Sequence, residues 1–98
     1  VDTGVGGRVA EIVGKKLKQV AARHQVISVT HLPQIAALAD AHFVVSKEVE
    51  KGRTFTNVER LSEKDRVAEV ARMLGGVKIT DQTRRHAAEL VKASLKAE

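Results

Sequence analysis

The sequence predicts an α/β fold with a buried parallel strand, then a strand pair, then two C-terminal helices. Three observations predict it. Residues 8–23 place apolar side chains at helical spacing, and residues 25–30 form a short β-branched run of the kind that fills a strand covered on both faces. After residue 62 the apolar positions return to a helical period in two stretches, which indicates helices at the end of the chain.

Composition limits the class of protein. Ninety-eight residues allow one domain, and 43% hydrophobic with 30% charged residues is the balance of a soluble globular chain. No apolar run approaches the roughly 18 residues that span a membrane. The absence of cysteine excludes disulfides and thiolate chemistry and is compatible with a reducing cytoplasm. We therefore expect a soluble, cytoplasmic protein. Because Val1 begins in the middle of a glycine-rich motif, we also expect a fragment of a longer protein.

The charge balance favours phosphate-rich partners. Lysine and arginine outnumber aspartate and glutamate by 17 to 12, a net charge of +5. With two Phe and no Tyr or Trp, the chain lacks the aromatic platforms on which single-stranded nucleic acids stack.

The first helix follows a glycine-rich opening, VDTGVGG, whose glycines allow a tight turn or a close approach to another chain or a phosphate. This opening does not match a phosphate loop or a dinucleotide fingerprint, so a plain flexible connection is the alternative. Residues 8–23 then predict a helix with an apolar stripe made of Val9, Ile12, Val13, Leu17, Val20 and Ala21. Its polar face is basic and includes Lys15, Lys16, Lys18 and Arg23.

The predicted strand over residues 25–30 is followed by His31 and by Pro33, which suits the first turn of a short helix ending near residue 39. His31 is thereby expected at the carboxyl edge of a sheet, where open α/β folds bind ligands. If a strand before Val1 runs parallel to residues 25–30, the glycine-rich turn reaches the same edge. An imidazole there can donate to a terminal phosphate oxygen, although a histidine at a strand end is more often a solvated loop residue.

The second half predicts a hairpin and two helices. Residues 43–45 and 54–61 indicate strands around a turn at Gly52, with a register that the apolar pattern does not fix. Ser62 with Asp65 predicts the cap of a helix over residues 63–74, and Thr80 predicts the cap of the last helix. No histidine pair has metal-ligand spacing and no serine lies in a nucleophile elbow, so we expect neither a metal site nor a catalytic triad.

Several segments together resemble the RecN family of bacterial DNA repair proteins, relatives of the SMC proteins among the ABC-type ATPases. They are VDTGVGG at 1–7, VTHLPQIAALAD at 29–40, FVVSK at 43–47, GRT at 52–54, ARMLGG at 71–76 and IT at 79–80. The resemblance implies that residues 1–98 are the C-terminal part of an ATPase head, and that the parent acts in DNA double-strand break repair and recombination.

The resemblance also implies roles for individual residues. His31 corresponds to the switch histidine that contacts the γ-phosphate of ATP. The opening VDTGVGG at 1–7 corresponds to the D-loop, which supplies the nucleotide-contacting residues Asp2, Thr3, Gly4, Gly6 and Gly7. Gly6 stands where many relatives carry an aspartate, which leaves the role of Asp2 open. The phosphate loop, signature motif, coiled coil and the carboxylates that organise Mg²⁺ are not in this chain.

The implied partners are ATP and Mg²⁺ in the intact parent, the missing N-terminal half of the same head, a second protomer through head-to-head engagement, and DNA. We expect no nucleotide to be bound or hydrolysed by the 98 residues alone. The alternative is a basic module, without enzymatic activity, that touches DNA through the cationic face of residues 8–23.

Overall fold

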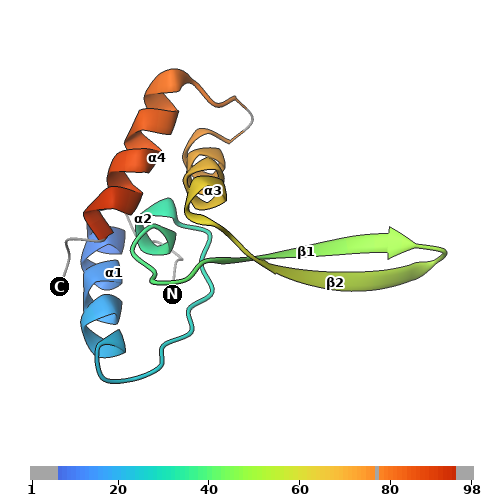
Figure 1. Ribbon diagram of the computed structural model, residues 1–98, viewed down its shortest axis with the longest axis horizontal. Helices are drawn as coiled ribbons and strands as arrows, with labels where there is room; N and C mark the ends of the chain where they lie inside the picture. The colour runs from blue at the N-terminus through green and yellow to red at the C-terminus, as the bar shows by residue number, and fades with distance from the viewer. Residues whose placement is uncertain (1–6, 77, 95–98) are drawn as a thin grey trace.

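The computed structural model describes residues 7–76 and 78–94 as a small α/β unit with an antiparallel strand pair and four helices. In chain order the elements are α1 (Gly7–Ala21), α2 (Pro33–Ala36), β1 (Phe43–Glu50), β2 (Arg53–Arg60), α3 (Glu63–Gly75) and α4 (Asp81–Ser94). The helices gather at one end of the molecule, and the hairpin of β1 and β2 projects away from them (Figure 1). The predicted order of a first helix, a strand pair and two final helices is confirmed.

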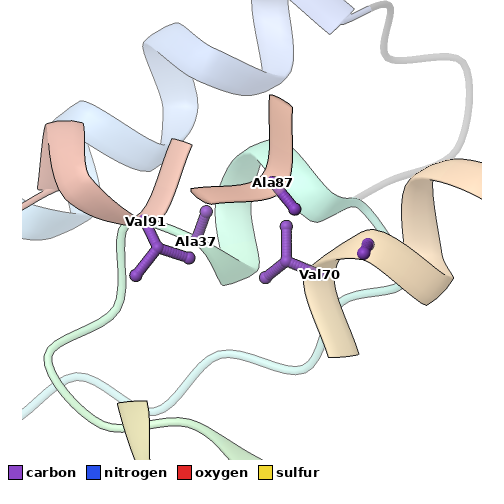
Figure 2. Close-up of a cluster of buried hydrophobic side chains, with 5 residues drawn as sticks. Ala37, Val70, Ala87 and Val91 are labelled. Carbon is purple, nitrogen blue, oxygen red and sulfur yellow. The ribbon is translucent and has the colours of Figure 1, made fainter. Parts of the chain in front are cut away.

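The hydrophobic core lies where α2 meets α3 and α4. Ala37, the residue after α2, is 1% exposed and packs with Val70 and Ala71 of α3 and with Ala87 and Val91 of α4. Figure 2 shows Ala37 pointing between the side chains of the two helices. The side chains in this core are small, so the helices approach closely. Adding or removing one methyl group there changes the stability of the fold. This packing anchors the carboxyl end of α2.

Local signals set the ends of α3 and α4. The Ser62 hydroxyl accepts from the Asp65 amide at 3.2 Å, and the Thr80 hydroxyl accepts from the Thr83 amide at 3.1 Å. Each side-chain oxygen satisfies an amide that a helix start leaves without a partner. Gly76 ends α3 with a φ of 64°, which glycine adopts without a steric cost. The predicted caps of both helices are confirmed.

The hairpin has a two-residue turn in which Lys51 and Gly52 both have positive φ angles, 51° and 76°. This is the backbone of a type I′ turn, whose twist matches that of the strands. The register pairs Val45 with Val58 and Phe43 with Arg60, whose guanidinium lies 5.9 Å from the Phe43 ring centroid. Leu61 extends the pairing by donating its amide to the His42 carbonyl at 2.9 Å.

The predicted parallel core strand at residues 25–30 is wrong for this structure, because these residues are extended without belonging to a sheet. Ile27 is 86% exposed and Val29 is 90% exposed, so the face that these two residues share is uncovered, whereas Val26 is partly buried. A strand forms by pairing its backbone with a neighbouring strand, and in the described part of the chain β1 and β2 pair with each other. The β-branched run indicates that the segment is suited to burial, but it does not show whether a neighbouring strand is present to pair with it.

The predicted apolar stripe of α1 is buried along a narrower line than expected. Ala10 and Gly14 are buried against α2, whereas Val9, Ile12 and Val20 are 51%, 53% and 48% exposed. The helix is confirmed, but the short α2 covers only part of its apolar stripe, in which Val13, Leu17 and Ala21 are partly buried. Val9, Ile12 and Val20 therefore leave apolar surface exposed, as do Ile27 and Val29.

Candidate functional site

His31 lies in the bend between the extended segment and α2, with its side chain exposed. The Thr30 hydroxyl accepts from the Leu32 amide at 3.0 Å, which turns the chain just ahead of the helix. Leu32 is extended, with φ −95° and ψ 121°, because the residue before a proline is kept out of the helical region. Pro33 then opens α2 at the first helical position. The local sequence thus places the His31 imidazole at the surface, immediately before α2.

Gly7, the first residue of α1, lies beside the same helix. A Cβ atom added to Gly7 would be 3.4 Å from Nε2 of Gln34, the second residue of α2. The end of the glycine-rich opening and the helix that follows His31 are therefore neighbours. Of the residues predicted to contact nucleotide, Gly7 and His31 are described, whereas Asp2, Thr3, Gly4 and Gly6 lie outside the described residues.

The contact continues along the two helices at Gly14. A Cβ atom at Gly14 would be 3.4 Å from the Gln34 carbonyl and 3.5 Å from the Ile35 Cα, which are backbone atoms. One helical turn further, Lys18 donates its Nζ to the Leu38 carbonyl at 3.2 Å and pairs with the Asp40 carboxylate at 3.1 Å. Contacts through Gly7, Gly14 and Lys18 therefore follow the whole length of α2.

Arg66 is the residue that sequence reasoning missed. It lies on α3, is 5% exposed, and donates Nη2 to the carbonyls of Ala37 at 2.7 Å, Ala36 at 3.4 Å and Ala39. Burial is the main cause that lowers the pKa of the Arg66 guanidinium, while Glu63 and Asp40 oppose the shift. A buried cation is tolerated where such hydrogen bonds replace its hydration. In sequence, Arg66 is one more charged residue on an amphipathic helix, and no motif singles it out.

His42 lies beside Arg66 at the base of the hairpin. Its Nδ1 and the Nε of Arg66 are the two buried side-chain polar atoms, among the described residues, that lack a hydrogen-bond partner. Burial lowers the pKa of His42 below 6.5, the Arg66 charge lowers the pKa further, and Glu69 raises it in part. The imidazole is therefore held neutral next to the buried guanidinium.

The basic face of α1 is smaller than its sequence suggests. The Lys18 side chain is 16% exposed and binds Leu38 and Asp40 in the loop after α2. Lys15 pairs with Glu11 at 3.4 Å. Of the four cations considered for DNA contact, Lys16 and Arg23 are exposed and form no ion pair within the part of the chain that the structure describes. This arrangement offers a weaker phosphate-binding surface than the sequence pattern indicated.

Other site types find little support in the described residues. No group of three or more metal-ligating side chains comes together within residues 7–76 and 78–94. None of the described helices has the length and apolar character to cross a bilayer. A cavity of about 270 Å³ lies between α1, α2 and α4, with Gln34 and Leu38 in its wall, and His31 does not line it.

Comparison with known proteins identifies the family. The chain is 52% identical over 92 residues to the DNA repair protein RecN of Bacillus subtilis, which covers 94% of this chain and 16% of the relative. It is 52% identical over 96 residues to the RecN of Mycobacterium leprae, covering 98% of this chain and 16% of that protein. This chain belongs to the RecN family.

A third relative, the RecN of Xylella fastidiosa, is 46% identical over 91 residues, covering 93% of this chain and 16% of its own length. No family model matches the sequence. The identities to these three RecN proteins confirm the resemblance that the sequence motifs indicate. The chain spans 16% of the length of these relatives, so its site is one part of what a whole RecN protein contains.

Proposed function

We propose that this chain is the C-terminal part of the ATP-binding and ATP-hydrolysing head of an SMC-like RecN protein acting in DNA double-strand break repair and recombination. The relatives carry the name DNA repair protein, which supports the repair role. The observation that supports the nucleotide role is the closeness of Gly7 to Gln34, because it puts the end of the glycine-rich opening beside the helix that begins two residues after His31.

In this proposal His31 donates a hydrogen bond from its imidazole to a terminal phosphate oxygen of ATP. His31 is an exposed residue, and the Thr30 hydroxyl and Pro33 fix the backbone on the helix side of it. The donor acts where negative charge grows as the phosphoryl group leaves, which is where a hydrogen bond accelerates the reaction. Gly7 and the glycines before it keep the backbone of the neighbouring segment free of side chains.

The described residues fit one part of a nucleotide site. They offer a histidine donor and a glycine, but no group of carboxylates that could hold Mg²⁺ among residues 7–76 and 78–94. ATP supplies the transferred phosphoryl group and Mg²⁺ neutralises its charge. In the proposal, the phosphate cradle and the Mg²⁺ ligands come from the N-terminal half of the head, and a second protomer completes the site.

The outward apolar side chains support a missing half. Val9, Ile12 and Val20 of α1 and Ile27 and Val29 of the extended segment form exposed apolar surface on consecutive parts of the chain. Exposed apolar side chains that gather into a contiguous surface are typical of interfaces. The proposal assigns it to the remaining residues of the same head.

The experiment compares the 98-residue chain with the full-length protein. We expect Mg²⁺-dependent ATP hydrolysis from the full-length protein and none from the chain alone. Hydrolysis by the chain alone, or no hydrolysis by the full-length protein with or without DNA, would contradict the proposal.

A DNA-binding module without enzymatic activity is the second candidate, supported by exposed Lys16 and Arg23 and by the net charge of +5. It predicts that the chain binds duplex DNA with an affinity that falls steeply with salt. A titration of the chain with DNA at two salt concentrations separates the candidates, because a head fragment has little affinity to lose.

A further inference from the structure

The carbonyl groups of four consecutive residues, the last residue of α2 and the three residues after it, accept hydrogen bonds from two cationic side chains. Arg66 reaches them from α3 and donates to the carbonyls of Ala36, Ala37 and Ala39. Lys18 reaches them from α1 and donates to the remaining carbonyl, that of Leu38, at 3.2 Å. We call Arg66 and Lys18 the carbonyl clamp.

The clamp acts where a short helix is weakest. The Ala36 carbonyl also accepts from the Ala39 amide at 3.3 Å, whereas the carbonyls of Ala37, Leu38 and Ala39 come just after α2, where helical hydrogen bonding ends and the helix dipole favours positive charge. α2 has four residues, too few to be stable without tertiary contacts. Arg66 is 5% exposed and the Lys18 side chain 16%, so neither cation is screened as a surface charge would be. The conformation of α2 therefore depends on these two side chains.

Hydrogen bonds carry the position of the clamped end back to His31. The Ala37 amide donates to the Pro33 carbonyl at 2.9 Å, and the Ala36 amide donates to the Leu32 carbonyl at 3.1 Å. The Leu32 amide donates in turn to the Thr30 hydroxyl at 3.0 Å. The backbone on both sides of His31 is thus joined to the residues that Arg66 and Lys18 hold.

We propose that Arg66 and Lys18 are positioning residues, which clamp the carbonyl end of α2 and thereby hold the backbone that presents His31 to the terminal phosphate. This inference rests on the proposed function of His31. It adds that α1 and α3, which contribute no side chain that contacts the phosphate in the proposal, determine the position of His31, which does. An error of about 1 Å in such a group can cost a hundredfold in rate.

The test uses the full-length protein with Arg66→Met and Lys18→Met, which keep an unbranched apolar stem and remove the donors. Arg72→Met and Lys64→Met, both on α3, are matched controls, because both residues are exposed and, among the described residues, neither donates to a carbonyl of residues 33–39. Arg66→Lys restores a cation that can still donate to the carbonyls. Lys18→Met keeps the test decisive if Arg66→Met does not fold.

Two measurements are made on each variant. Hydrogen exchange without nucleotide is expected to accelerate about tenfold or more at residues 32–39 in the clamp variants, with exchange in α4 changed less than about twofold. The turnover number for ATP is expected to fall about tenfold, with less than about a threefold change in KM, because the clamp acts on the reacting phosphate. Arg66→Lys is expected to restore part of the slow exchange at residues 32–39 and part of the turnover number. The controls are expected to match the parent in both measurements.

Unchanged exchange at residues 32–39, or exchange that rises equally in α2, α3 and α4, would overturn the clamp and leave Arg66 and Lys18 as ordinary packing residues. The proposal would also be overturned if exchange at residues 32–39 rises in the clamp variants while their turnover number equals that of the parent and the turnover number of His31→Ala is reduced. If the segment loosens and neither the clamp variants nor His31→Ala slow turnover, the clamp on the backbone stands and the proposed role of His31 fails.

Discussion

Gly14 of α1 lies so close to Leu38 that a Cβ atom on Gly14 would come within 2.6 Å of the Leu38 Cδ1 atom. Leu38 can rotate away from a methyl group, but the Gln34 carbonyl, 3.4 Å from the same position, belongs to the backbone and cannot. A side chain larger than a methyl group at Gly14 would therefore push α1 and α2 apart, and with them Gly7 and the segment after His31.

Gly14→Val is expected to destabilise the chain by about 1 to 3 kcal/mol, because the added methyl groups force α2 away from α1. Urea unfolding of the parent and variant chains measures the change. Lys16→Val is the matched control, since it places the same β-branched residue on the exposed face of the same helix. Equal stability of Gly14→Val and the control would show that the close approach is not required.

The stability of the fold is expected to fall as the pH drops below 6.5. Burial and the Arg66 charge keep the pKa of His42 in the folded chain below its ordinary value of 6.5. Between the folded pKa and 6.5 the unfolded chain binds more protons, so acidification favours unfolding there. The contribution is complete above pH 6.5 and is lost as the pH falls to the folded pKa.

Urea unfolding between pH 7.5 and pH 5 measures this dependence, and His42→Gln is expected to flatten it by removing the titrating group. His86→Gln, on the exposed face of α4, serves as the control. A parent chain whose stability does not change over this range, or a His86→Gln variant that flattens the curve equally, would contradict the assignment to His42.

The exposed segment at residues 25–30 gives a prediction that differs between the chain and the full-length protein. In the 98-residue chain, Ile27→Ser is expected to change stability by less than about 0.5 kcal/mol, because the side chain is 86% exposed. In the full-length protein the same substitution is expected to cost about 2 to 5 kcal/mol, since the proposed head covers Ile27.

Denaturant titrations of both proteins make the comparison, with Lys16→Ser as the control that stays exposed in each. A full-length protein indifferent to Ile27→Ser would remove the support that this surface gives to a missing half of the head.

Short-range signals predicted much of this fold. The caps at Ser62 and Thr80, the turn at Gly52 and the start of α2 at Pro33 depend on residues within four positions of one another, so the sequence displays them directly. The long-range contacts could not be predicted in the same way. Arg66 reaches carbonyls 27 to 30 positions earlier in the chain, and no local pattern distinguishes it from a solvated helix residue.

The error at residues 25–30 has the same cause. An apolar run such as that around Ile27 shows that a segment is suited to burial, whereas the neighbour that would pair with it is a property of the whole fold. For the candidate site, the structure places His31 in a bend before α2 and not at the carboxyl edge of a sheet, and its contact with phosphate stays a prediction. The contacts of Lys18 and Gly14 depend on how α1 and α2 pack against each other, which no local pattern in the sequence specifies. Figure 1 shows the two helices as neighbours.

The most direct test of the central claim is the turnover of the full-length protein carrying His31→Ala, with His86→Ala, another exposed histidine, as the control. A donor aligned with the charge on the departing phosphoryl group contributes about 2.7 to 4 kcal/mol, so the turnover number is expected to fall on the order of a hundredfold or more. ATP affinity is expected to fall much less, because most contacts to bound ATP come from other residues. His86→Ala is expected to match the parent. Hydrolysis by His31→Ala at the parent rate would contradict the account.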